Sequence, residues 1–207
     1  DAVIIRHGQS GAPHYLADRI GARVINAGDG QHEHPTQALL DLMTIREQFE
    51  KLEGLEVALI GDIRHSRVAR SNLIAMKTLG MKVRVAGPAT LVPKELCDVY
   101  GCERCDTVEQ AMEGAHVVMS LRLQRERMVS GMLPSLREYA VEYGINSKLL
   151  EKTRHEAILM HPGPVNRGVE LAADIVDGSR SVILNQVENG VAVRCAVLYS
   201  ILGGEQP

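Results

Sequence analysis

Residues 28–37 read GDGQHEHPTQ, and this stretch leads from a predicted strand into a predicted helix. The segment before it, 22–26, has the apolar pattern of a short strand, and the two glycines predict a turn. Pro35 suits the first position of a helix, and apolar residues recur behind it at helical spacing over 35–52. The sequence therefore predicts a strand-turn-helix unit with His34 at the helix cap and Gln37 in the first turn.

This helix start is a candidate binding site. Unpaired backbone amides and the positive end of the helix dipole favour an anion at such a terminus. An imidazole N–H from His34 and a carboxamide from Gln37 could both address one small ligand, such as a carbonyl oxygen with an amide neighbour. A capped surface helix is the simpler interpretation of a His-Pro pair, so the site hypothesis depends on what the remaining chain adds.

Polar residues also follow four apolar strands elsewhere in the chain. In an open parallel sheet, ligands bind beyond the carboxyl ends of the strands, so these residues are predicted to meet at one edge. The four runs are Val3–Ile5 before Arg6, Val57–Ile60 before Gly61 and Arg67, Val117–Leu121 before Arg122 and Gln124, and Ile158–Met160 before the sequence His161-Pro162-Gly163-Pro164.

Strand and helix patterns alternate along the whole chain. This alternation predicts an α/β fold, a parallel sheet between helical layers joined by right-handed crossovers. Strands are expected near 2–6, 22–26, 57–61, 82–87, 116–121, 156–160 and 181–186, and helices near 35–52, 66–79, 92–100, 107–113, 145–152 and 187–203.

Composition excludes several classes of function. The chain has 207 residues, of which 45% are hydrophobic and 24% charged, as in ordinary globular proteins. Its net charge of −3 and pI near 6.3 give no electrostatic reason to expect nucleic acid or an anionic membrane as partner. No apolar run reaches the roughly 18 residues of a membrane span, so a cytoplasmic protein is expected.

Two residue groups raise the possibility of a metal. Cys102 and Cys105 form one Cys-x-x-Cys near Cys97, but a structural zinc site usually has a second pair, so reduced thiols are favoured. His32-Glu33-His34 resembles the opening of a binuclear hydrolase site, yet His161 is the one further strand-end candidate of note. Neither a metal nor another cofactor is expected.

Five motifs in a fixed order resemble those of the carbamoyltransferase family, and within it the enzymes that use L-aspartate. They are Arg6-His7, His34-Pro35-Thr36-Gln37, Gly61-Asp62 with Ser66-Arg67, Arg122-Leu123-Gln124 with Glu126-Arg127, and His161-Pro162-Gly163-Pro164 with Val165-Asn166-Arg167-Gly168. The resemblance covers nearly the whole chain. It implies transfer of a carbamoyl group from carbamoyl phosphate to L-aspartate, a step of pyrimidine synthesis.

The same resemblance implies a missing part. The family's Ser-Thr-Arg-Thr phosphate loop and the following serine-lysine loop do not occur in this sequence, which opens on Asp1. The chain is therefore expected to be the C-terminal part of a longer enzyme and to be inactive alone. Residues 1–52 would end the carbamoyl-phosphate domain and include a linking helix, 53–185 would form the aspartate domain, and 186–207 would return to the first domain, with apolar surface left exposed.

Site roles follow from the resemblance. Arg6 and His34 would donate to the carbonyl oxygen, and Gln37 would hold the carbamoyl NH2 together with backbone carbonyls of the loop at Pro162, Gly163 and Pro164. His34 would act as a neutral donor, because a helix N-terminus disfavours an imidazolium. Metal-free chemistry suffices, since positioning and oxyanion donors lower the barrier.

The choice of aspartate as the second substrate is inferred from two arginines. Arg67 and Arg122, assisted by Gln124, would clamp the two carboxylates of aspartate. Ornithine carbamoyltransferases, the same-class alternative, carry a His-Cys-Leu-Pro motif where this chain has His161-Pro162-Gly163-Pro164. A catalytically inactive scaffold is the second alternative.

The resemblance further implies a homotrimer, in which regulatory chains or a dihydroorotase are possible partners. The Gly- and Pro-punctuated segment 128–135, with the charged stretch behind it, is interpreted either as a lid or as a long surface connection.

Overall fold

The computed structural model describes residues 1–123 and 135–203. Two parallel sheets organise these residues. A two-stranded sheet pairs β1 with β2, and a five-stranded sheet has the order β5-β4-β3-β6-β7. The strands are β1 (Ala2–His7), β2 (Arg23–Asp29), β3 (Glu56–Ile60), β4 (Lys82–Ala86), β5 (Glu103–Arg104), β6 (Val117–Ser120) and β7 (Ile158–Met160).

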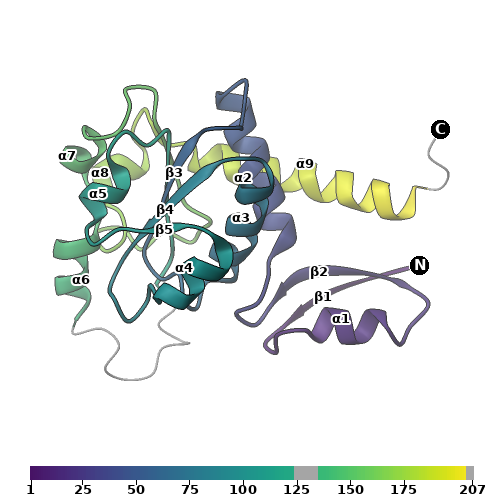
Figure 1. The fold of residues 1–207 in the computed structure, drawn as a ribbon. Helices are drawn as coiled ribbons and strands as arrows, with labels where there is room; N and C mark the ends of the chain where they lie inside the picture. Colours follow the sequence, from purple (N-terminus) through teal and green to yellow (C-terminus); the bar gives the residue numbers. More distant parts are fainter. Residues whose placement is uncertain (124–134, 204–207) are drawn as a thin grey trace.

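Helices lie on both faces of the larger sheet (Figure 1). This arrangement confirms the predicted α/β class with a parallel sheet between helical layers. The described helices are α1 (Ala12–Ala17), α2 (Pro35–Gln48), α3 (Arg67–Thr78), α4 (Lys94–Tyr100), α5 (Val108–Met112), α6 (Leu136–Tyr143), α7 (Ser147–Leu150), α8 (Ala173–Val176) and α9 (Ile183–Leu202).

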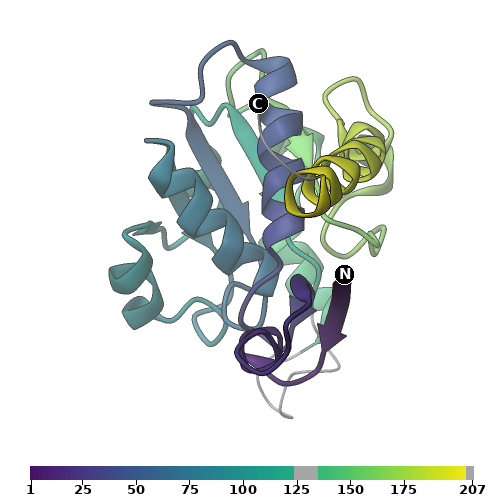
Figure 2. The same cartoon turned by 90° about the vertical axis from the view of Figure 1, so that its right-hand side faces the viewer.

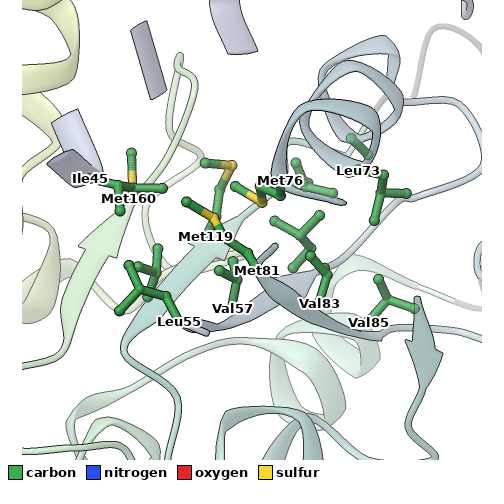
Figure 3. Close-up of a cluster of buried hydrophobic side chains, with 14 of the residues drawn as sticks. Ile45, Leu55, Val57, Leu73, Met76, Met81, Val83, Val85, Met119 and Met160 are labelled. Carbon is green, nitrogen blue, oxygen red and sulfur yellow. The ribbon is translucent and has the colours of Figure 1, made fainter. Parts of the chain in front are cut away.

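Side-chain alternation along the strands explains the two layers. Val57 and Leu59 of β3 belong to one buried cluster, with residues from α2, α3 and α4. Ala58 and Ile60 of the same strand belong to the other, with residues from α5, α7 and α8. The first cluster is drawn in Figure 3, where Ile45 of α2 and Leu73 of α3 lie over the strands. A strand apolar on both faces is typical of a covered parallel sheet.

The order of the strands creates a switch point between β3 and β6. From β3 the chain continues outward through β4 to β5, and then crosses back to form β6 and β7 on the other side of β3. Loops that leave β3 and β6 therefore turn away from each other at the carboxyl edge, which leaves a crevice where ligands of open α/β sheets bind.

The smaller sheet, with α1, lies apart from the larger one in Figure 1, and α2 connects the two parts. Helix α9 packs against α2 and crosses it, since α2 stands upright in both views while α9 runs across Figure 1 and is seen nearly end-on in Figure 2. The outward side of α9 carries apolar residues, among them Leu184, 80% exposed, and Tyr199, 77% exposed. The expected apolar surface on the last helix is thus present. The boundaries 1–52, 53–185 and 186–207 stay predictions.

One predicted strand is wrong. Residues 181–186 were expected to form a strand, but Ser181 makes a single bridge to Leu159 and α9 already begins at Ile183. Val182 and Ile183 are buried apolar residues at the helix start, so their short apolar run imitated a strand. The sequence also gave no prediction of α1, α6, α8 or β5, each of which spans eight residues or fewer.

The segment interpreted either as a lid or as a long surface connection falls largely outside the described residues. The structure does not describe residues 124–134, which include Gln124, Arg125, Glu126, Arg127 and most of segment 128–135. Behind it the structure shows helix α6, whose N-cap Ser135 accepts a hydrogen bond from the Glu138 backbone N–H at 3.0 Å. Tyr139 of this helix is buried.

Within residues 1–123 and 135–203, the structure contains no helix long and apolar enough to cross a membrane.

Candidate functional site

A pocket of about 250 Å³ lies at the carboxyl edge of the strands. This volume is slightly below the roughly 300–1,000 Å³ typical of small-molecule sites. Its walls come from the end of β1, the start of α2, the start of α3, the loops after β6 and β7, and α9. The lining residues are Arg6, His34, Gln37, Ser66, Arg67, Val68, Arg122, Pro162, Gly163, Pro164 and Arg194.

A folded loop presents His34 to this pocket. The buried carboxylate of Asp29 accepts hydrogen bonds from the backbone N–H groups of Gly11 at 2.6 Å and Glu33 at 3.1 Å, and from the Asn26 side chain at 2.9 Å. His34 is the N-cap of α2 and Pro35 its first residue, as predicted. The His34 backbone N–H donates to Ser71 Oγ at 2.8 Å, which fixes this helix start against α3.

The His34 side chain caps nothing. It makes no capping hydrogen bond to α2, and its Nδ1 is buried without a hydrogen-bond partner in the described part of the chain. Burial, together with the charges of Arg67, Arg6 and Arg194, lowers the pKa of His34 to about 4. The imidazole of His34 is therefore neutral at neutral pH, as predicted. The cause is burial and the neighbouring arginines, whereas the sequence had suggested the helix dipole.

Arg67 is the first residue of α3 and is only 7% exposed. Ser66 before it caps the helix by accepting a hydrogen bond from the Ala69 backbone N–H at 3.1 Å. The guanidinium of Arg67 lies directly over Gly28, whose φ is +116°; a Cβ there would stand 2.7 Å from Arg67 Cζ. Glycine at position 28, in β2, therefore serves two purposes: it adopts the positive φ and it leaves room for the arginine.

The loop after β7 forms the opposite wall. The His161 backbone N–H donates to Gln186 Oε1 of α9 at 2.9 Å, and the Gly163 backbone N–H donates to His161 Nδ1 at 2.9 Å. Burial, aided by the charge of Arg122, lowers the pKa of His161 to about 4. A neutral His161 is thus an internal support of the Pro162–Pro164 loop.

The described charged side chains that line the pocket are all positive. Four arginines line it, Arg6, Arg67, Arg122 and Arg194, and the described lining includes no acidic residue. Guanidinium groups bind carboxylates and phosphates with paired hydrogen bonds. The pocket is therefore built for an anionic ligand, while His34 and Gln37 add neutral donor and acceptor groups.

Most of the predicted site residues meet in this pocket. Arg6, His34, Gln37, Arg67, Arg122, Gly163 and Pro164 all line it, together with Pro162. Gln124 lies outside the described residues. Their individual roles stay predictions.

Arg194 was missed by the sequence interpretation. It is the one charged residue in the run Val191–Leu198 of α9, and such an isolated charge in an apolar segment was a usable signal.

The two candidate metal motifs do not gather into a cluster. His32 Nδ1 lies 3.0 Å from Asp29 Oδ2, whereas His34 lines the pocket. The four cysteines are free. Across the described ranges, 1–123 and 135–203, no three His, Cys, Asp or Glu side chains are arranged to hold a metal ion.

The fold and pocket define a class: an α/β protein that binds a small anionic ligand at the switch point of a parallel sheet. Comparison with protein families narrows this class. Residues 53–201 match the Asp/Orn binding domain of aspartate/ornithine carbamoyltransferase, and residues 1–47 match the carbamoyl-P binding domain. The chain belongs to the aspartate/ornithine carbamoyltransferase family.

Relatives with curated names belong to the same family. The aspartate carbamoyltransferase catalytic subunit of Syntrophotalea carbinolica is 55% identical over 206 residues, which is 100% of this chain and 66% of that protein. The subunit of the same name from Acetivibrio thermocellus is 57% identical over 199 residues, 96% of this chain and 64% of that protein. The chain thus spans slightly less than two thirds of the length of these relatives.

Solved structures share the fold. Ornithine carbamoyltransferase from Thermus thermophilus superposes with a TM-score of 0.83 at 31% identity, covering 97% of this chain and 66% of that one. Aspartate transcarbamoylase from Trypanosoma cruzi, in complex with N-(phosphonacetyl)-L-aspartic acid, gives a TM-score of 0.86 at 28% identity, covering 98% and 66%. Because enzymes of both specificities superpose equally well, the fold does not choose between aspartate and ornithine.

Proposed function

We propose that the natural full-length protein transfers the carbamoyl group of carbamoyl phosphate to the amino group of L-aspartate. The products are N-carbamoyl-L-aspartate and phosphate. The observation that carries the proposal is the pocket itself, in which four arginines surround a neutral histidine and a carboxamide. Both substrates are anions, and the reacting carbonyl between them needs uncharged and cationic donors.

The chemistry requires no covalent intermediate. The amine nitrogen attacks the carbonyl carbon of a mixed anhydride, the C–O bond to phosphate breaks, and the nitrogen loses a proton. Charge develops on the carbonyl oxygen, which Arg6 and His34 would stabilise by donating hydrogen bonds. Gln37 Oε1 and the backbone carbonyls of the Pro162–Pro164 loop would accept from the carbamoyl NH2.

Aspartate is the acceptor that suits the remaining arginines. Arg67 and Arg122 would each bind one carboxylate, with Gln124 as a further donor. Ornithine would bring a cationic side chain into a pocket lined by four arginines, and like charges repel there. The curated relatives at 55% and 57% identity are named for aspartate, which supports the same choice.

The wider setting belongs to the same proposal. Carbamoyl aspartate formation would serve de novo pyrimidine biosynthesis in the cytoplasm. A homotrimer is the proposed assembly. The part of the first domain that this chain lacks would cover the outward apolar face of α9 and that of the small sheet, where Ile4 is 61% exposed. Regulatory chains or a dihydroorotase are candidate partners.

Steady-state kinetics on the full-length protein test the proposal. Ureido product is measured by colorimetry with aspartate and with ornithine at matched concentrations. We expect turnover with aspartate and none above background with ornithine. Faster turnover with ornithine would refute the substrate assignment, and no turnover with either would favour the scaffold alternative.

A further inference from the structure

A buried carboxylate lies behind the pocket wall. Asp41 of α2 is 0% exposed and accepts three hydrogen bonds from side-chain amides. Gln37 Nε2 donates to Oδ1 at 3.0 Å, Gln186 Nε2 donates to Oδ1 at 2.8 Å, and Asn72 Nδ2 donates to Oδ2 at 2.7 Å. Three helices, α2, α3 and α9, are joined at this one side chain.

Burying this carboxylate is energetically unfavourable. An ionised group inside a protein costs several kcal/mol unless it is paired or well hydrogen-bonded. The pKa of Asp41 is raised to about 6, because burial outweighs the hydrogen bonds from Asn72, Gln186 and Gln37 and the charge of Arg194, which lower it. An apolar residue would fill the same space at lower cost, so a functional reason for the carboxylate is worth seeking.

The first consequence concerns the orientation of Gln37. A carboxylate can only accept hydrogen bonds, so the NH2 end of the Gln37 carboxamide must face Asp41. The carbonyl end, Oε1, is thereby directed away from Asp41, on a residue that lines the pocket. An amide whose two ends differ little in size needs such a partner to present one defined end.

The second consequence concerns the opposite wall. Gln186 donates to Asp41 through Nε2 and accepts from the His161 backbone N–H through Oε1. His161 directly precedes Pro162 and Gly163, which line the pocket. Asp41 thus connects, through one glutamine each, to two separate groups that face the same ligand.

We propose that Asp41 is a positioning residue of the carbamoyl subsite: it presents Gln37 Oε1 as an acceptor and, through Gln186, fixes the Pro162–Pro164 loop, so that both address one NH2 group. This inference rests on the proposed function. It explains why an acceptor with two oxygens stands at position 41: Oδ1 serves the two glutamines and Oδ2 anchors the carboxylate to α3.

Two substitutions at position 41 separate positioning from charge. Asp41→Asn keeps an oxygen that can accept from both glutamines, and its NH2 can donate to Asn72 Oδ1, which is buried and accepts no hydrogen bond from the described residues. Asp41→Leu keeps the shape and removes the acceptors. We expect Asp41→Leu to lower kcat about tenfold, the factor for one lost orienting hydrogen bond, and Asp41→Asn to stay within about threefold of wild type.

A double-mutant cycle tests whether Asp41 acts through Gln37. In a Gln37→Ala background the effect of Asp41→Leu should shrink from about tenfold to about threefold, because only the Gln186 branch remains. The full-length enzyme is used, and binding of carbamoyl phosphate is compared with binding of inorganic phosphate. Asp41→Leu should weaken the first and leave the second unchanged, since phosphate lacks the NH2 group.

Asn189→Leu is the matched control. Asn189 is also a buried amide between α9 and α2, donating to Thr44 Oγ1 at 3.0 Å and Glu47 Oε2 at 2.7 Å, and it is not a pocket residue. Its loss should lower the melting temperature with kcat unchanged. If Asp41→Leu does not fold, Gln186→Met tests the same network from α9, with an expected threefold to tenfold loss of kcat.

The outcomes are distinguishable. A wild-type enzyme that transfers to aspartate, with non-additive Asp41 and Gln37 effects and an active Asp41→Asn variant, supports the inference. Additive effects, equal losses in Asp41→Asn and Asp41→Leu, or an unaffected kcat in Gln186→Met overturn it while the proposed function stands. A wild-type enzyme without transferase activity overturns the proposed function, and this role with it.

Discussion

His34 offers the sharpest separation of catalysis from folding. Its side chain makes no capping hydrogen bond and its Nδ1 has no partner among residues 1–123 and 135–203, so His34→Ala removes no described side-chain bond that holds α2. The backbone bond from His34 N–H to Ser71 Oγ is retained in the variant. We therefore expect the free energy of unfolding to change by less than about 1 kcal/mol, because the N-cap position loses no side-chain hydrogen bond to the helix.

Turnover should respond strongly to the same change. A lost donor to a developing oxyanion typically costs about 2.7–4 kcal/mol, or about 10²–10³ in kcat. Because the pKa of His34 is about 4, the donor is neutral throughout the neutral range, and this loss should be the same at pH 7 and pH 8. The KM for aspartate should change much less.

The assay is ureido formation by the full-length enzyme, with thermal unfolding measured in parallel. Thr107→Ala is the control, because Thr107 caps α5 by accepting from the Gln110 backbone N–H at 3.1 Å and is not a pocket residue. It should lose about 1 kcal/mol of stability and keep its turnover. A well-folded His34→Ala enzyme with normal kcat would remove His34 from the chemistry.

Three further predictions concern the arginines, Gly28 and pH. Arg67→Ala or Arg122→Ala should reduce kcat/KM for aspartate by about 10–150-fold, the equivalent of one charge-assisted bond, while carbamoyl phosphate binding measured by calorimetry survives; loss of both would argue against separate subsites. Gly28→Ala should weaken aspartate use through displaced Arg67, whereas Gly54→Ala, also at positive φ (+80°) but with no atom within 4 Å of the added Cβ, should only lower stability. Folding lowers the pKa of His34 and His161 from an ordinary 6.5 to about 4, so these groups reduce the free energy of unfolding as pH falls from 6.5 to 4, whereas Asp41, whose pKa is raised from 3.8 to about 6, increases it. Urea unfolding should therefore show a net loss of stability on the order of 3 kcal/mol between pH 7 and pH 4. A stability that does not change between these pH values would contradict the prediction.

Long periodic elements were predictable because local pattern and burial coincide in them. The helix from Pro35 and the strand through Val57–Ile60 both lie where the sequence indicates. Short elements were not predictable, since a run such as Val182-Ile183 is equally compatible with a strand and with the buried first turn of α9. Tertiary contact with Leu159 and α2 decides that case.

The site divides in the same way. Strand-end residues such as Arg6 and Arg122 follow from the rule that parallel strands share one carboxyl edge. Asp41 and Gln186 are 145 positions apart in the sequence, and no local sequence pattern predicts the hydrogen bond between them. The low pKa of His34 likewise depends on arginines from β1, α3 and α9, which only the fold assembles.

The most direct test of carbamoyl transfer to aspartate is isotope tracing in a single mixture. Carbamoyl phosphate labelled with ¹³C is incubated with the full-length protein and equal concentrations of aspartate and ornithine, and the products are resolved by ¹³C NMR. The account predicts that the label enters the ureido carbon of N-carbamoyl-L-aspartate. Label in citrulline, or release only as bicarbonate at the uncatalysed rate, would contradict it.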